Sequence, residues 1–139
     1  TDLEGQYQFY HDANDLPTVY APLWGFCDKT DPHWLGTMQF AFTPDNKGGY
    51  YLGHFVGLGS VHTPHKWPFG DGQELLYAWI SGDDKRKQQV LEKLKTTACW
   101  DGMYNEAVDE NTGEILSRYW FSWPGAFIGC GLKLTAALS

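Results

Sequence analysis

The sequence is poor in charged residues, and in basic residues above all. Charged side chains make up 19% of its 139 positions, and 10 Lys and Arg stand against 17 Asp and Glu, for a net charge of −7. Nucleic-acid phosphates and anionic membrane surfaces both attract a basic face, so this balance disfavours these two classes of partner. No run of 18 apolar residues occurs, and a transmembrane helix is therefore not expected.

Cysteine is also scarce. Cys27, Cys99 and Cys130 are odd in number and lack CxxC spacing. This pattern favours three buried free thiols, although one disulfide with one free thiol stays open. Asn-x-Ser/Thr sequons are missing too, so the sequence indicates no cellular compartment.

Apolar and aromatic residues, by contrast, are plentiful. Hydrophobic residues make up 42% of the chain and aromatic residues 17%, with seven Trp, eight Tyr and eight Phe. Such a composition suffices for a packed core and disfavours disorder. A chain of this length suits one domain, so residues 1–139 are interpreted as a single segment.

Capping residues and apolar periodicity predict five helices. Asp15 and Asp31 are N-cap types followed by Pro in the first helical turn. Gly82 ends one predicted helix, and Asp83 caps the next, whose apolar side chains recur at helical spacing. The predicted helices span residues 15–27, 32–42, 69–81, 84–98 and 120–137.

The predicted helices form hairpins joined by long loops, over residues 43–67 and 100–118. Helix 84–98 has a polar face, as an outer helix should, whereas the first, third and fifth helices are apolar nearly all round, as inner helices are. This alternation predicts an all-α fold, in which helical hairpins form part of an α/α barrel with the long loops on one rim. Five helices cannot close such a barrel, so we expect the rest of the polypeptide or another subunit to cover the apolar face.

The starts of the three inner helices gather polar and aromatic side chains. If these helices run parallel, their N-termini lie at one end of the bundle and bring carboxylates, His, Arg and Trp together. The mixture suits a carbohydrate, because sugar hydroxyls pair with Asp, Asn and Arg, and the apolar face of a sugar ring packs on Trp. Glycoside hydrolysis also needs two carboxyl groups, an acid and a base or nucleophile.

Four blocks of sequence carry a resemblance to a known family. They are HDANDLPT (residues 11–18), GLGSVHTPHKWP (57–68), MYNEA (103–107) and SRYWFSW (117–123). In order and spacing they resemble the metal-independent exo-α-1,6-mannosidases of glycoside hydrolase family 125. Members of that family have an (α/α)6 barrel, invert the anomeric centre and are much longer than this chain. The resemblance therefore implies the C-terminal third of an α/α-barrel catalytic domain.

The resemblance also implies roles for individual residues. It makes Glu106 the general base and places the general acid, an Asp, outside this chain. The implied sugar-binding residues are Asp12, Asn14, His62, Arg118, Trp120 and Trp123. To these we add Trp67, as a third tryptophan that packs against the sugar ring beside Trp120 and Trp123. No metal and no other cofactor is expected. The implied function is that of an exo-acting, inverting glycosidase that cleaves α-mannosides.

This sequence departs from the family pattern at three places. Asn105 stands where the family usually has His, and Pro124 with Gly125 follows the Trp-rich block in place of Ala-Asn. His65 and Lys66 occupy a block that is usually more apolar. A related six-hairpin glycosidase with another sugar or linkage therefore stays open.

Several candidates also have plain structural interpretations. A loop carboxylate such as Glu106 is usually only solvated, and Asp12 and Asp15 are typical N-caps. Trp120 and Trp123 are three residues apart on one helix face, a spacing that core packing also explains. Arg118 in turn has carboxylates near it in sequence with which it could simply pair.

Two further functions stay open. One is a non-catalytic carbohydrate-binding or interaction fragment, whose incomplete barrel binds a sugar without cleaving it. It differs from the enzyme in lacking a general acid within about 6.5–9.5 Å of the base. The other is a zinc hydrolase built on His62 and His65, with His54 nearby.

Overall fold

The computed structural model describes residues 3–137, which form five helices and two short antiparallel hairpins. The helices are α1 (Leu16–Tyr20), α2 (Pro32–Ala41), α3 (Pro68–Ser81), α4 (Asp84–Thr97) and α5 (Ser122–Ala137). One hairpin pairs β1 (Tyr50–Tyr51) with β2 (Gly57–Leu58), and the other pairs β3 (Ala107–Val108) with β4 (Ile115–Ser117). The chain is mostly helical, as predicted.

Four helices lie within a few residues of their predicted bounds, because their end signals are local. The Asp31 side chain accepts hydrogen bonds from two backbone N–H groups in the first turn of α2. Asp83 caps α4 in the same way, through the N–H of Arg86. Gly82 ends α3 with a left-handed φ of 76°, a conformation that glycine adopts without strain.

The predicted first helix, residues 15–27, is wrong in length. The observed helix α1 ends at Tyr20, and residues 21–27 form turns. Pro22 has no N–H for the helical ladder, and its ring crowds the preceding turn. Gly25 then takes a left-handed φ of 72°, which turns the chain away from a helical path.

Both hairpins lie inside segments that were predicted to be loops. Their strands are only two or three residues long, too short for an alternating pattern to be visible in the sequence. Lys66 joins the two hairpins through its backbone, because it bridges Gly59 on one side and Val108 on the other. The carbonyl of Lys66 accepts the N–H of Val108 at 2.9 Å. The two long loops are thus held together by backbone hydrogen bonds.

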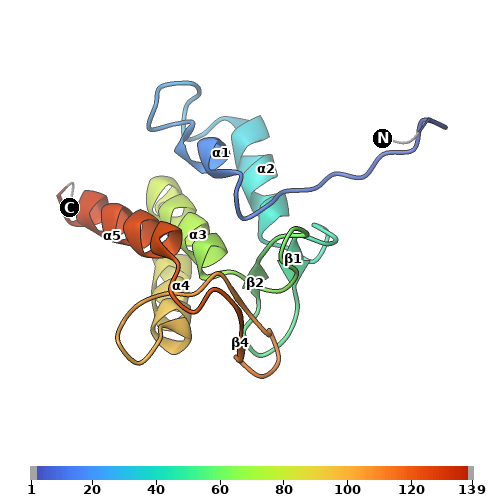
Figure 1. Ribbon diagram of the computed structural model, residues 1–139. Coiled ribbons are helices and arrows are strands. Elements are labelled where there is room, and N and C mark those ends of the chain that lie inside the picture. The colour runs from blue at the N-terminus through green and yellow to red at the C-terminus, as the bar shows by residue number, and fades with distance from the viewer. Residues whose placement is uncertain (1–2, 138–139) are drawn as a thin grey trace.

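Helix α3 lies at the centre of the fold, with α4 and α5 packed along it (Figure 1). Nearly all of its residues are buried. Gly72 allows the close approach of α5, since a Cβ there would come within 2.7 Å of the Phe127 ring. Helix α4 buries Val90 and Leu94 and exposes its charged face. The predicted inner and outer positions of α3 and α4 are confirmed.

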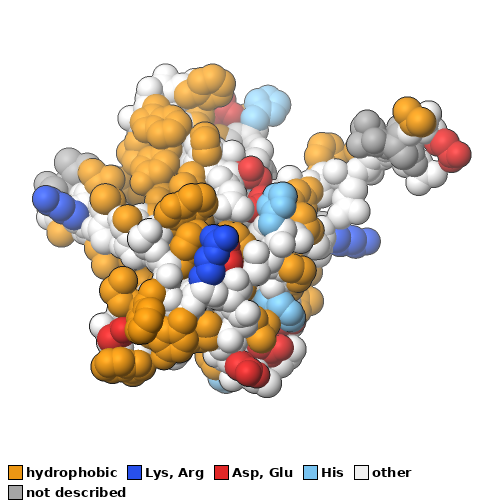
Figure 2. Space-filling model, viewed as in Figure 1, with side chains coloured by type: hydrophobic (Ala, Val, Ile, Leu, Met, Phe, Trp, Pro, Cys, Tyr) orange, Lys and Arg blue, Asp and Glu red, His pale blue; other side chains and the backbone are white. Residues whose placement is uncertain are grey.

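Helix α5 and the segment after α1 leave apolar side chains uncovered. Phe127 and Ile128 are buried, but Trp123 and Leu132 on the same helix are exposed. Trp24 is 65% exposed in the turns after α1. Figure 2 shows hydrophobic side chains gathered over α1 and the turns that follow it. No helix within residues 3–137 combines the length and apolar character that spanning a membrane requires.

The three cysteines are free thiols with different environments. Cys99 is buried and Cys27 is half-buried, whereas Cys130 is exposed on α5. The prediction of buried thiols therefore holds for Cys99 alone. It is wrong for Cys130, because no neighbour covers that side of α5 within the described chain, and Cys27 is only half-buried.

Candidate active site

An open cleft of about 980 Å³ lies where the starts of α1, α3 and α5 meet the β3–β4 hairpin. Six of the eight predicted site residues line it: Asn14, His62, Trp67, Glu106, Arg118 and Trp123. The other two, Asp12 and Trp120, do not. Polar and aromatic side chains therefore do gather where the three predicted inner helices begin. Asn14 lies before α1, His62 and Trp67 lie before α3, Arg118 lies before α5 and Trp123 lies in its first turn.

Glu106 is held rigidly at the edge of the cleft. It immediately precedes β3 and is 5% exposed. The Ser117 hydroxyl donates to its Oε2 at 2.5 Å, and Nη1 of Arg118 lies 3.2 Å from its Oε1. The Glu106 N–H is shared between the carbonyls of the same two residues, at 3.2 Å each. The interpretation of Glu106 as a merely solvated loop carboxylate is therefore wrong.

Arg118 has a solvent-exposed side chain and a strained backbone. Its φ of 43° lies in the left-handed region, which is uncommon for a residue with a side chain. The guanidinium lies 5.3 Å from the centre of the Phe121 ring, a cation–π distance. Its side chain is 62% exposed, so the charge can meet a ligand in the cleft while it remains paired with Glu106.

Asp12 does not line the cleft, but its carboxylate holds residues that do. Its Oδ1 accepts both the backbone and the side-chain N–H groups of Asn14 at 2.8 Å, and its Oδ2 accepts the hydroxyls of Ser60, at 2.7 Å, and of Tyr10. Burial alone would raise the pKa of the Asp12 carboxyl, but these hydrogen bonds hold that pKa below its usual value. Ser60 also accepts the backbone N–H of His62 at 3.0 Å. Asp12 therefore organises two residues that line the cleft.

The two candidate tryptophans of the α5 start have different positions. Trp123 lines the cleft and packs against Phe121 and Phe69, with ring centroids 5.1 and 6.3 Å away. Trp120 lies away from the cleft, and its Nε1 donates to Asp101 at 2.7 Å. Both are more than half exposed, so neither is a core residue in this chain.

A sequence model of one protein family, described as metal-independent alpha-mannosidase (GH125), matches residues 1–130. The chain belongs to this family.

Two comparisons extend the GH125 match. The Meiotically up-regulated gene 157 protein of Schizosaccharomyces pombe is 28% identical over 125 residues, which cover 88% of this chain and 24% of that protein. A solved metal-independent alpha mannosidase from Streptococcus pneumoniae, in a non-productive complex with alpha-1,6-mannobiose, matches with a TM-score of 0.80 at 24% identity. That match covers 100% of this chain and 32% of the solved one. The fold is therefore that of part of an (α/α)6 barrel, and the chain spans a third or less of the length of these relatives.

The GH125 chain assembles no metal site among the residues that are described. Within residues 3–137, no three His, Cys, Asp or Glu side chains gather so that they could hold an ion. Nδ1 of His65 lies 2.9 Å from Oε2 of Glu110, and its ring stacks on Tyr51. His65 is thus committed to another contact, and the zinc interpretation with His54 and His62 is wrong for the described chain.

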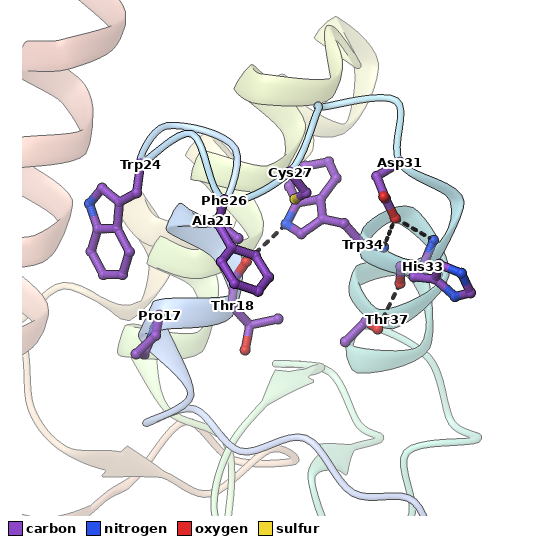
Figure 3. Close-up of a pocket in the computed structure, with 10 residues that line it drawn as sticks. All are labelled: Pro17, Thr18, Ala21, Trp24, Phe26, Cys27, Asp31, His33, Trp34 and Thr37. Atoms are coloured by element: carbon purple, nitrogen blue, oxygen red, sulfur yellow. Dashed lines mark hydrogen bonds between the residues drawn. The ribbon is translucent and has the colours of Figure 1, made fainter.

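A second cavity, of about 600 Å³, lies between α1, the turns after it and α2 (Figure 3). Several of its polar groups are already committed. Asp31 caps α2, Thr37 donates to the carbonyl of His33, and Nε1 of Trp34 donates to the carbonyl of Thr18. Two of its aromatic side chains, Trp24 and Phe26, are exposed to solvent.

A buried charge cluster lies beneath the long loops. Lys66 and Asp71 form an ion pair and are 1% and 0% exposed. Nζ of Lys93 lies 3.4 Å from Asp71 and 2.6 Å from Glu74. Burial lowers the pKa of the Lys66 ammonium below its usual value, although the Asp71 carboxylate acts against this. Burial also acts to lower the pKa of Lys93, but the carboxylates of Asp71 and Glu74 outweigh it and raise that pKa above its usual value. Two acidic residues in a helix that is otherwise apolar were the sequence signal for this cluster, and it was missed.

Proposed function

We propose that this chain is the C-terminal segment of an exo-acting, inverting α-mannosidase, in which it supplies the general base and part of the sugar site. The observation that carries the proposal is the Glu106 carboxylate, which is buried, held at both oxygens and directed to a cleft with Arg118 and Trp123. Membership of GH125 supports the same function.

In the proposed reaction, Glu106 takes a proton from a water molecule as the water oxygen attacks the anomeric carbon. The bond from that carbon to the leaving oxygen breaks on the opposite face. The leaving oxygen keeps the electron pair of that bond and accepts a proton from the general acid. Asn14 and His62 are placed to bind sugar hydroxyls, and Trp123 offers its face to the sugar ring.

The general acid of the proposed reaction comes from outside this chain. Among the described residues that line the cleft, Glu106 is the only carboxylate. An inverting enzyme needs a second carboxyl group about 6.5–9.5 Å from the first, with room for the water between them.

The uncovered apolar surface supports the same view. The exposed side of α5 and the cavity of Figure 3 present Trp123, Trp24 and Phe26 to solvent, with Phe26 87% exposed. A surface of this kind is expected to be covered. We propose that the rest of the barrel covers it, as part of the same polypeptide or as a separate subunit.

The test measures hydrolysis of α-1,6-mannobiose by the polypeptide as it occurs in its source. It compares the variants Glu106→Gln and Glu114→Gln with the parent. Glu114 is an exposed carboxylate on the same hairpin and serves as the matched control. We expect about a 1,000-fold loss of kcat for Glu106→Gln, because the base is removed, and little change for Glu114→Gln. Product released with inverted configuration, read by NMR, agrees with the mechanism. Full activity of Glu106→Gln would overturn it.

Within residues 3–137, no second carboxylate lines the cleft, and this also favours one other function, sugar binding without cleavage. Native mass spectrometry separates the two. A 139-residue chain that travels with a larger piece fits the split or nicked enzyme, whereas a lone 15.8 kDa monomer that binds mannobiose without turnover fits the binding fragment.

A further inference from the structure

Ser117 and Arg118 are neighbours in the chain, yet both contact the Glu106 carboxylate. The Ser117 hydroxyl bonds Oε2 at 2.5 Å, and the Arg118 guanidinium lies 3.2 Å from Oε1. In a regular strand, successive side chains point to opposite faces, so two consecutive residues could not reach one carboxylate. The left-handed φ of 43° at Arg118 breaks this alternation at the end of β4. A strained backbone at a non-glycine residue is typical of functional sites.

Ser117 acts from outside the cleft. It is half-buried and, unlike Arg118, is not among the residues that line the cavity. Its carbonyl accepts the N–H of Glu106, and it is the strand partner of Ala107, next to an irregularity in the register between Ala107 and Val108. Both its backbone and its side chain therefore hold Glu106, and neither is placed to touch a sugar.

We propose that Ser117 is a positioning residue for Glu106, an inference that rests on the proposed role of Glu106 as the base. A hydroxyl that donates to one carboxylate oxygen fixes the rotation of the carboxyl group. Arg118 holds the other oxygen from the cleft side, so the two residues together set the plane of the carboxylate.

The test compares three variants of the active polypeptide by steady-state kinetics and by thermal unfolding. Ser117→Ala removes the hydroxyl, Ser117→Thr keeps it, and Ser81→Ala removes a hydroxyl that bonds only the α3 backbone. For Ser117→Ala we expect kcat to fall about 10- to 100-fold with KM nearly unchanged, because the carboxyl group loses its fixed rotation while the residues that line the cleft stay in place. Ser117→Thr should restore kcat, and Ser81→Ala should match the parent.

A Ser117→Ala variant with the parent's kcat would overturn the inference. So would a loss of kcat that Ser117→Thr does not rescue while the melting temperature falls equally in both variants, since that describes a structural role. Failure of the proposed function is separate, because it appears as activity that survives Glu106→Gln. If Glu106→Gln is inactive and Ser117→Ala is normal, only the role of Ser117 is rejected.

Discussion

Two carboxylate–cation pairs in this chain use the same chemistry in opposite surroundings. Asp71 and Lys66 meet in the interior, where their side chains are 0% and 1% exposed. Glu106 and Arg118 meet at the cleft, where their side chains are 6% and 62% exposed. The interior pair is closed to ligands and can only hold α3 against the loops. The cleft pair leaves a cation accessible beside a fixed carboxylate, which is what a binding and reaction site needs.

The difference also affects stability. Buried charges lose their favourable interaction with water. Their mutual attraction offsets this loss only when both partners are present. In the cleft pair only Glu106 is buried, and it also keeps a hydrogen bond from Ser117; the exposed Arg118 charge stays in contact with water, so the pairing itself contributes little to stability. Substitutions in the interior pair should therefore act on folding, and substitutions in the cleft pair on substrate handling.

The largest effect is expected for Asp71→Leu, which leaves Lys66 buried without its carboxylate. The free energy of unfolding should fall by about 3–5 kcal/mol, measured by urea denaturation. Asp45→Leu, at an exposed loop position, is the control and should change it by less than about 0.5 kcal/mol.

Adding Lys66→Met to Asp71→Leu sharpens the test, because it removes the orphaned charge. The double variant should recover most of the lost stability, since Lys93 can still pair with Glu74 at 2.6 Å. Losses that simply add would contradict the pairing of Lys66 with Asp71.

A smaller effect is expected at Asp12, which is buried like Asp71 but is held by neutral donors. Hydrogen bonds from Tyr10, Asn14 and Ser60 keep the pKa of Asp12 below its ordinary value of 3.8, against the upward effect of burial. Their contribution to stability is thus complete above about pH 4 and is lost as the pH falls through the lower folded-state pKa. Asp12→Asn should cost about 1–2 kcal/mol at pH 7, and the difference from the parent should shrink in strong acid. An equal difference at every pH would contradict this account.

The smallest effect on stability is expected for Arg118→Gln. Because this side chain is 62% exposed and Glu106 keeps its hydrogen bond from Ser117 at 2.5 Å, the free energy of unfolding should fall by less than about 1 kcal/mol. Mannobiose hydrolysis should nonetheless weaken through a higher KM, since a charged donor is lost from the cleft. A large loss of stability with an unchanged KM would mean that Arg118 acts on folding, as the interior pair does, and would contradict the comparison.

Sequence reasoning succeeded where the signals were local. Asp31, Gly82 and Asp83 mark helix ends through contacts with residues next to them, so α2, α3 and α4 were predictable. It failed at Pro22, where a rule for helix interiors was overlooked, and at the hairpins, whose short strands depend on bonds between distant segments such as Lys66 and Val108.

The candidate site shows the same division. The four blocks indicated which residues belong together, and six of the eight candidates do line one cleft. The separate positions of Trp120 and Trp123 were not predictable, because an aromatic residue at a helix start has the same local pattern whichever side it faces. The role proposed for Ser117 was not predicted from the sequence, because a serine at the end of a strand carries no signal until the carboxylate that it contacts is known.

The sequence by itself determined the helical character, the family and the set of residues from which the site is drawn, since periodicity, caps and motifs are written along the chain. Tertiary structure alone decided which charges are buried, which carboxylate has its oxygens held by neighbours and which aromatic side chains face the cleft. The physical reason is that burial and hydrogen-bond partnership depend on residues far apart in sequence. Glu106 and Asp71 are both acidic side chains in the sequence, and only their surroundings make one a candidate base and the other part of the core.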